Sequence, residues 1–440
     1  MGMRSARLGG LVAALLASTI AARADNATLT IATVNNGDMI VMQKLSPQFE
    51  KETGIKLNWV VLEENVLRQR LTTDIATKGG QFDVMTIGAY EAPIWAKQGW
   101  LLPLDDLGDG YDYKDLIPQV KEATTVDGKM YAAPFYAESS FTYYRKDLFD
   151  KAGITMPEKP TYAQIAEYAD KVSDKKNGIY GICLRGKPGW GENMAFLSTA
   201  VNAFGGEWFN MKWEPQLTTQ PWKSAIDWYL DVMKKDGPPG PTANGFNENQ
   251  ALFANGKCGM WIDATSGAGR IYDPKQSQVA DKTAFTASPV TDKDPKASGW
   301  FWSWNLAVPA STKQGDAAKK FIAWATSKTY VGLVGKSEGW VAAPPGTRLS
   351  TYSNADYQKA APFAATVLKA IETTDPKHPT VDPVPYTGVQ FVAIPEFQAI
   401  GTNVGQDISA ALAGQDSAEA ALKKGQSTTE RTMKQAGYPK

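Results

Sequence analysis

Short apolar runs alternate with amphipathic stretches in the first part of the chain after its N-terminal segment. The runs at 29–34 (LTIATV), 56–62 (KLNWVVL) and 82–88 (FDVMTIG) have the length and composition of buried strands. Apolar residues recur at helical spacing over 66–75, between the second and third runs, and Gly54 suits the end of an earlier helix. This β-α-β-α-β order predicts parallel strands joined by right-handed crossovers.

The middle of the chain repeats the pattern. Thr161 and Gln164 have the spacing of a capping box and predict the start of a helix. A strand is predicted at 179–184 (IYGICL), a helix with one buried apolar face over 222–233, and another strand at 258–262. The sequence therefore predicts a second α/β body after the first.

Three stretches of chain connect the two bodies in this interpretation. Residues 128–149 hold two apolar runs around the polar group Glu138-Ser139-Ser140, and residues 298–309 and 337–348 provide the other two connections. Bodies joined in this way open and close about the connections as a hinge, and the seam between them is a favoured place for a small-molecule site. We expect an N-terminal lobe of residues 25–136 and 304–337, a C-terminal lobe of residues 140–300 and 341–440, and a hinge near 137–139, 301–303 and 338–340.

The first 24 residues have the layout of a secretory signal peptide. Arg4 and Arg7 precede an apolar run that is short for a membrane span, and Ala22-Arg23-Ala24 forms a small-x-small cleavage site before Asp25. A retained N-terminal anchor is the alternative. We expect cleavage and export to the periplasm.

Composition narrows the classes of function. The predicted cleavage removes three arginines and no acidic residue, so the 46 basic residues become 43 against 46 acidic ones, a net charge of −3. Such a chain has no basic excess with which to bind nucleic acid. Several of its 14 tryptophans stand next to Gly, Asn or Asp rather than in apolar periodic runs, which suggests a surface that stacks on a ligand.

The cysteines and the single histidine limit the available chemistry. Cys183 and Cys258 both fall in predicted buried strands, where we expect two free thiols, although an exported protein also permits a disulfide. His378 lies in a proline-rich loop, so a His-based catalytic triad or a His-rich metal site has no second histidine to use. We expect neither a metal nor another cofactor.

Three segments together carry a resemblance to a known family. They are 82–104 (FDVMTIGAYEAPIWAKQGWLLPL), 128–149 (GKMYAAPFYAESSFTYYRKDLF) and 251–264 (ALFANGKCGMWIDA). In this order they resemble the extracytoplasmic solute-binding proteins of ABC carbohydrate importers. With 61–71 (VLEENVLRQRL), the chain is most similar to the sorbitol/mannitol binders of that maltose-binding-like family. The resemblance covers nearly the whole mature chain, but no single motif in it is as specific as a nucleotide or metal signature.

The resemblance implies a fold and a function. The fold is the two-lobed periplasmic binding protein fold (type II), in which each lobe has a mainly parallel sheet flanked by helices and three chain segments form the hinge. The function is that of a monomeric receptor, not an enzyme, which captures a sugar alcohol such as sorbitol, mannitol or arabitol by hinge closure and delivers it to the transmembrane permease subunits. A mono- or disaccharide receptor is the first alternative. A secreted carbohydrate-active enzyme is a remote one, because the sequence shows no nucleophile elbow, phosphate-binding loop or metal-spaced cluster.

Candidate ligand contacts stand at strand ends and at the predicted connections. A polyol needs aromatic faces over its C–H surface and paired hydrogen-bonding groups for its hydroxyls. Ligands of parallel sheets bind outside the carboxyl ends of the strands. The candidates are Asn36, Asp38, Glu63 and Tyr90 in the first body, Glu138 at the first connection, Arg185, Trp190 and Asp263 in the second body, and Trp302, Trp340 and Arg348 at the later connections.

Several of these residue types also have an ordinary structural role. Asn36 and Asp38 also suit a simple turn, Glu63 suits a helix N-terminus, and its neighbour Glu64 could exchange roles with it. Arg185 could instead form a surface ion pair. Trp300, Trp302 and Trp304 alternate as on one face of a strand, and that face either lines the cleft or packs against the hinge.

Overall fold

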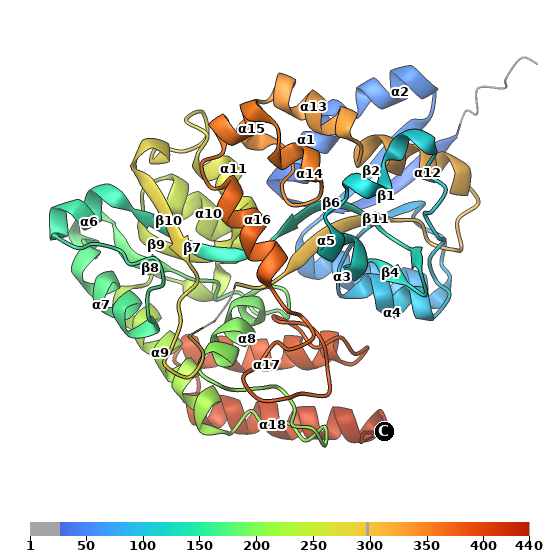
Figure 1. The fold of residues 1–440 in the computed structure, drawn as a ribbon. Coiled ribbons are helices and arrows are strands. Elements are labelled where there is room, and N and C mark those ends of the chain that lie inside the picture. The colour runs from blue at the N-terminus through green and yellow to red at the C-terminus, as the bar shows by residue number, and fades with distance from the viewer. Residues whose placement is uncertain (1–26, 296–298, 440) are drawn as a thin grey trace, which may run out of the picture.

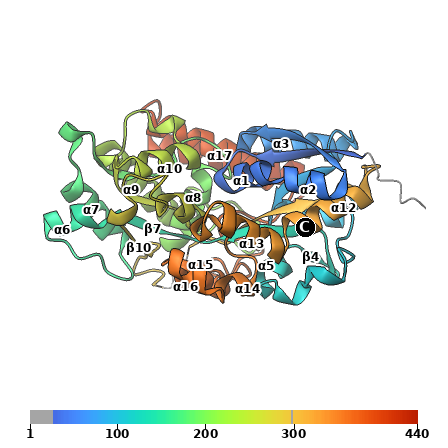
Figure 2. The same cartoon turned by 90° about the horizontal axis from the view of Figure 1, so that it is seen from above.

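Two β-sheets, each with its own helices, form the two lobes of the protein. The computed structural model describes residues 27–295 and 299–439, so the predicted signal peptide, residues 1–24, lies outside the described residues. Figure 1 shows the lobes side by side, with the blue N-terminal elements in one and the green middle of the chain in the other. Figure 2 shows the same arrangement from above. The predicted two-lobed α/β fold is confirmed.

The first sheet has four strands in one direction and one in the other. Its strands are β1 (Thr28–Val34), β2 (Lys56–Leu62), β3 (Val84–Gly88), β6 (Ala133–Glu138) and β11 (Trp302–Ala307), in the spatial order β2-β1-β3-β11-β6. β1 is parallel to β2 and β3, whereas β11 is antiparallel to β3 and β6. The strands predicted at 29–34, 56–62 and 82–88 are thus confirmed. The helices of these chain segments are α1 (Gly37–Leu45), α2 (Pro47–Thr53), α3 (Glu64–Thr77), α4 (Glu91–Lys97), α5 (Pro118–Ala123), α12 (Gly315–Ala325) and α13 (Lys328–Ser337), and β4 (Thr125–Val126) pairs with β5 (Lys129–Met130).

The second sheet has four strands, three of which run in one direction. They are β7 (Ser140–Arg145), β8 (Tyr180–Cys183), β9 (Cys258–Ala264) and β10 (Thr283–Ala287), in the order β10-β7-β9-β8, with β7 antiparallel to β9 and β10. The helices are α6 (Lys146–Ala152), α7 (Tyr162–Val172), α8 (Asn193–Ala203), α9 (Gln220–Asp236), α10 (Phe246–Ala254) and α11 (Ala268–Ile271). The predicted capping box is present, because Thr161 Oγ1 accepts from the Gln164 amide and Gln164 Oε1 accepts from the Thr161 amide.

The C-terminal part of the chain touches both lobes. The short helices α14 (Leu349–Tyr352), α15 (Ala355–Ala360) and α16 (Ala364–Thr373) follow the third connection, and α17 (Phe397–Leu412) and α18 (Ala418–Gln435) pack on α8 and α9 of the second lobe (Figure 1). Backbone amides of Ile117 and Ala137 in the first lobe donate to carbonyls of Thr347 and Pro345. The predicted lobe boundary at residue 341 therefore stays a prediction.

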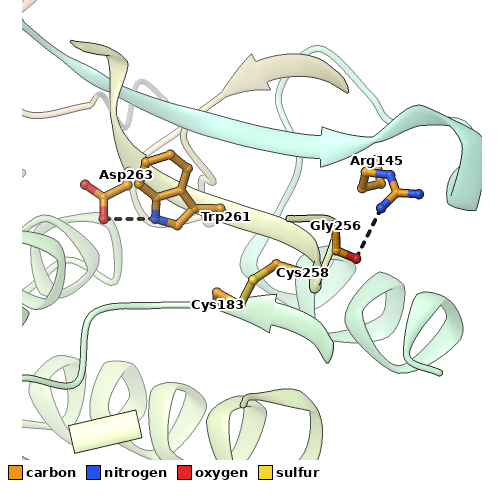
Figure 3. Close-up of a disulfide and its surroundings, with 6 residues drawn as sticks. All are labelled: Arg145, Cys183, Gly256, Cys258, Trp261 and Asp263. Atoms are coloured by element: carbon orange, nitrogen blue, oxygen red, sulfur yellow. Dashed lines mark hydrogen bonds between the residues drawn. A yellow bond between two sulfur atoms is a disulfide. The ribbon is translucent and has the colours of Figure 1, made fainter. Parts of the chain in front are cut away.

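The two cysteines form a disulfide, so the prediction of two free thiols is wrong. Cys183 at the end of β8 and Cys258 at the start of β9 have Cα atoms 5.9 Å apart, and both residues are fully buried (Figure 3). The physical reason is the lateral order of the strands, since β8 and β9 are neighbours in the sheet although 75 residues separate the two cysteines.

Within residues 27–295 and 299–439, no helix is long and apolar enough to span a bilayer.

Candidate functional site

A cavity of about 130 Å³ lies where the two lobes meet. The first lobe contributes the end of β1, the first turn of α3, the end of β6 and the start of β11. The second lobe contributes the loop after β8, the start of α10 and the 3₁₀ turn η5 (Thr265–Gly267). The polar and aromatic residues at this cavity are Asn35, Asn36, Glu63, Glu64, Arg68, Tyr136, Glu138, Arg185, Lys187, Trp190, Glu192, Phe246, Asn247, Glu248, Ser266, Trp300, Trp302, Trp304 and Gln390.

The alternating tryptophans form one wall of this cavity. Trp302 and Trp304 point to the same side of β11, with ring centroids 5.5 Å apart, and Trp300 lines the cavity just before that strand. Trp190 from the second lobe meets Trp302 edge-on, with centroids 5.7 Å apart. The tryptophan face therefore lines the cleft, which is one of the two roles that the sequence left open for it.

Arg68 on α3 lies at the centre of this aromatic group. Its guanidinium carbon is 4.0 Å from the ring centroid of Trp190 and 4.9 and 4.8 Å from those of Trp302 and Trp304. Its Nη1 atom lies 2.6 Å from Glu91 Oε1, and Nη2 lies 2.8 Å from Glu64 Oε1. Burial lowers the pKa of Arg68, but the two carboxylates more than offset this effect and hold the pKa above its usual value.

Sequence reasoning missed Arg68. The Glu64–Arg68 pair at i and i+4 on one helix face was an available signal, since such pairs form ion pairs along a helix. The contact with Glu91 was not predictable, because α4 follows a different strand. Glu192, Tyr136, Ser266 and Gln390 were missed as well, and no local motif marks them.

Arg185 borders the cavity and is held from behind by Asp263. The Arg185 Nε and Nη2 atoms lie 2.9 and 2.5 Å from the two carboxylate oxygens of Asp263, and Nη1 donates to the Gly191 carbonyl at 2.8 Å. Asp263 is fully buried and also accepts from the Trp261 indole at 3.1 Å (Figure 3). Asp263 does not border the cavity, so the structure makes it a group that orients Arg185.

Two buried glutamates line the cavity and titrate far from their usual range. Burial raises the pKa of Glu138 to about 8, although its carboxylate accepts hydrogen bonds from Ser266 Oγ and, at 3.4 Å, from the Trp300 indole. Burial also raises the pKa of Glu192 to about 8, against the opposing charge of Arg185. A raised pKa favours the neutral carboxyl near neutral pH, and the O–H of Glu138 could then be donated to an oxygen atom in the cavity.

The cations at the cavity are already neutralised. Lys187 lies 2.6 Å from Glu63, which joins the loop after β8 to the N-terminus of α3 across the two lobes. Arg68 and Arg185 have the carboxylate partners described above. Acidic residues therefore match or exceed the basic ones at this site, which favours a neutral ligand over a phosphorylated one.

Asn36 and Glu63 have a structural role as well as a place at the cavity. Asn36 Oδ1 accepts from the Met39 amide at the start of α1, and its Nδ2 donates to the Tyr136 hydroxyl at 2.8 Å. Glu63 caps α3 through the amides of the two residues that follow Glu64. The helix-terminal role considered for Glu63 thus coexists with its place at the site.

Two further candidates lie near the cavity without lining it. Tyr90 is buried behind Trp190, with ring centroids 4.7 Å apart, and its hydroxyl donates to the Ile394 carbonyl at 2.8 Å. Asp38 lies in the first turn of α1 and borders a second, larger cavity next to the first.

The last two candidates line neither cavity. Trp340 opens the 3₁₀ turn η7 (Trp340–Ala342) and packs against α13. Arg348 is fully buried in the first lobe, where it donates to the carbonyls of Thr326 at 2.9 Å and Tyr111 at 3.0 Å. Asn36, Glu63, Glu138, Arg185, Trp190 and Trp302 are brought together at the cavity, whereas Asp38, Tyr90, Asp263, Trp340 and Arg348 are not. Whether any of the eleven touches a ligand remains a prediction.

Comparison with known proteins gives consistent similarities. Residues 36–331 match the family described as bacterial extracellular solute-binding protein. The chain is 55% identical to the mannitol-binding protein of Pseudomonas aeruginosa over 433 residues. The matched region covers 98% of each of the two chains. A crystal structure of a solute-binding protein from Agrobacterium vitis S4 with bound D-mannitol has a TM-score of 0.93 and 63% identity, over 94% of this chain and 100% of that one. A second, from Agrobacterium radiobacter K84 in complex with ribitol, has a TM-score of 0.82 and 26% identity, over 92% and 99%.

Proposed function

This chain belongs to the bacterial extracellular solute-binding protein family, and we propose that it is the substrate-binding component of an ABC transporter for a sugar alcohol, with mannitol as the first candidate. It is a binding protein rather than an enzyme, as the family is. The observation that carries the proposal is the cavity between the lobes, which is lined by tryptophans together with buried carboxyl and guanidinium groups. Its volume of about 130 Å³ is small beside the roughly 300–1,000 Å³ of sites for drug-sized ligands, which favours a compact ligand.

The geometry suits the chemistry of a polyol. The faces of Trp302 and Trp304 cover C–H surface, while Arg185 donates to hydroxyls. Glu138 and Glu192 supply oxygens that accept, and their raised pKa values also let them donate. A ligand that lacks a matching hydroxyl leaves one of these buried groups unpaired, which costs about 1–3 kcal/mol per group.

Ligand capture would proceed by closure of the lobes about the hinge. Two hydrogen-bonded contacts join cavity residues of the two lobes, Lys187–Glu63 and the 2.8 Å bond from Asn247 Nδ2 to the Asn35 carbonyl. A ligand that touches both lobes stabilises the closed form only to the extent that its contacts differ between the open and closed states. The closed, monomeric receptor then presents both lobes to the permease subunits.

We also propose that the mature protein works in the periplasm after removal of residues 1–24. The Cys183–Cys258 disulfide supports an oxidising compartment. A mono- or disaccharide remains the alternative ligand.

Thermal unfolding against a ligand panel tests the proposal. Ligand-free mature protein would be heated with mannitol, sorbitol, arabitol, glucose or maltose at equal concentration. A ligand at 100 to 1,000 times its Kd adds about 3–4 kcal/mol to the free energy of unfolding and raises the Tm by several degrees. We expect that shift with mannitol. A shift with maltose alone would contradict the polyol assignment, and no shift with any of the five would contradict the receptor assignment.

A further inference from the structure

Tyr90 of the first lobe packs among side chains of the second lobe. It stands two residues after β3, at the start of α4, and is only 3% exposed. Its ring centroid lies 4.7 Å from that of Trp190, 5.5 Å from that of Phe391 and 6.4 Å from that of Phe397. We call these three rings, together with the backbone of Ile394 and Gln398, the Tyr90 socket.

The hydroxyl of Tyr90 is bonded to the socket as well. It donates to the Ile394 carbonyl at 2.8 Å, and the backbone amide of Gln398 donates to it at 3.3 Å. The hydroxyl thus uses both its donor and its acceptor capacity on the same short segment of chain. Tyr90 is held by its apolar ring and by its polar end at once.

The socket is attached to the second lobe. α17, which carries Phe397 and Gln398, packs on α8 and α9 of that lobe. The loop before α17, orange-red in Figure 1, is tied to α8, because Asn202 Nδ2 donates to the Val389 carbonyl at 2.9 Å. Trp190 belongs to the loop after β8. The contacts of Tyr90 with the socket therefore join the two lobes.

These contacts lie at the edge of the cavity. Tyr90 does not line the cavity, but Trp190 does, and the guanidinium carbon of Arg68 in the first lobe is 4.0 Å from the Trp190 ring centroid. Thr72 Oγ1 on α3 also donates to Gln398 Oε1 across the seam, at 3.1 Å. Movement of the lobes apart would separate these groups together.

We propose that Tyr90 is a closure latch, a residue that stabilises the closed arrangement of the lobes and so raises the affinity for the ligand without touching it. This inference rests on the proposed polyol function. Opening about the hinge would withdraw Tyr90 from its socket and give the ring and the hydroxyl back to water. The latch therefore adds the same free energy to closure around every ligand, whereas a residue that touches the ligand discriminates between ligands. Tyr90 is a positioning residue in this sense.

Binding measurements with several polyols separate a latch from a ligand contact. Mannitol, sorbitol and arabitol are titrated into the mature wild-type protein and into Tyr90→Phe, which lacks the hydroxyl and keeps the ring. We expect the variant to raise the Kd of every polyol that wild type binds by one common factor, about 3- to 10-fold, the loss of one hydrogen bond. Stopped-flow measurements should place the change in the dissociation rate, because the latch forms after the ligand has entered. The free energy of unfolding of the ligand-free protein should stay at the wild-type value.

Tyr113→Phe is the matched control. The Tyr113 hydroxyl has the same pattern of bonds, but within the first lobe: it donates to the Leu104 carbonyl at 2.6 Å and accepts from the Leu107 amide at 2.9 Å. This variant should lower the free energy of unfolding of the ligand-free protein and leave each Kd within twofold of wild type.

Three results with Tyr90→Phe would overturn the latch. Unchanged Kd values would show that the contact does not contribute to closure, and a factor that differs between polyols would make Tyr90 a ligand contact. A loss of stability in the ligand-free protein as large as the loss of binding energy, or a failure to fold, would show that the contact persists in the open state. If wild type binds none of the three polyols, the proposed function itself fails, and the latch for polyol capture fails with it.

Discussion

Gly191 is the position where a single methyl group should hold the lobes apart. It lies in the loop after β8, and a Cβ added there would be 2.3 Å from Glu64 Oε1 and 3.0 and 3.1 Å from the Nη2 and Nε of Arg68. Both of those residues belong to α3 in the other lobe. Ordinary contacts begin near 3.4 Å, so the loop and the helix have to separate by about 1 Å to admit the methyl group.

The penalty of Gly191→Ala should fall on the closed state. Overpacking of a dense contact costs about 1–3 kcal/mol, and Glu64 cannot easily yield because it is bonded to Arg68. In the open state of the proposed hinge motion, the loop and α3 would be apart and the methyl group would meet solvent. The cost is therefore subtracted from the free energy of ligand binding, which predicts a Kd for mannitol about 5- to 150-fold higher.

Calorimetry with mannitol measures that change, and small-angle X-ray scattering with saturating mannitol reports whether the variant still contracts. Gly332→Ala on α13 is the control, since a Cβ there meets no atom within 4 Å. A Kd within twofold of wild type would refute the reasoning. So would a loss of stability in the ligand-free protein as large as the loss of binding energy, because the clash would then act within a lobe.

Three other predictions follow from buried groups. Asp263→Asn removes the closest counter-charge of the buried Arg185 guanidinium and leaves only Glu192, at 3.6 Å. We expect urea titration to give a free energy of unfolding about 3–5 kcal/mol lower and calorimetry to show weaker mannitol binding, whereas unchanged stability would contradict the pairing. The pKa of Glu138 is about 8 in the folded protein against 4.5 when unfolded. The protonated carboxyl therefore contributes its full stabilisation below pH 4.5, and this stabilisation is lost as the pH rises to 8. Wild type should therefore lose stability relative to Glu138→Gln between pH 5 and pH 8 in urea titrations, and a parallel pH dependence of the two proteins would show that Glu138 does not titrate there. Replacing both Cys183 and Cys258 by Ala should cost about 2–4 kcal/mol of unfolding free energy, because the disulfide closes a chain segment of 75 residues, whereas a cost near zero would argue against the disulfide.

Local patterns were enough to predict several strands and helices of both lobes. β1, β2 and β3 match apolar runs of strand length, and the capping box of α7 forms between residues three positions apart. The alternation of Trp300, Trp302 and Trp304 also predicted a shared face, because successive side chains of a strand point to opposite sides. These features depend on neighbours along the chain, which the sequence lists in order.

The same is true of the polar residues that follow strands. Asn36 and Arg185 follow closely after β1 and β8, and Trp190 lies further along the loop after β8. The carboxyl ends of these strands face the seam between the lobes. The sequence alone thus located much of the candidate site, together with the α/β class and the two-lobed organisation.

Tertiary structure decided what depends on lateral order and on the approach of the lobes. The disulfide exists because β8 and β9 are neighbours in the sheet. Asp263 holds Arg185 because the strands that precede them are also adjacent. Arg68 contacts Trp190 only because the second lobe places Trp190 against α3 of the first lobe. Arg348 follows the third connection as predicted but turns into the first lobe, where backbone carbonyls take up its donors. Periodicity specifies which face of an element is buried, whereas the partner on that face is selected by packing among segments far apart in the sequence, and no local pattern encodes it.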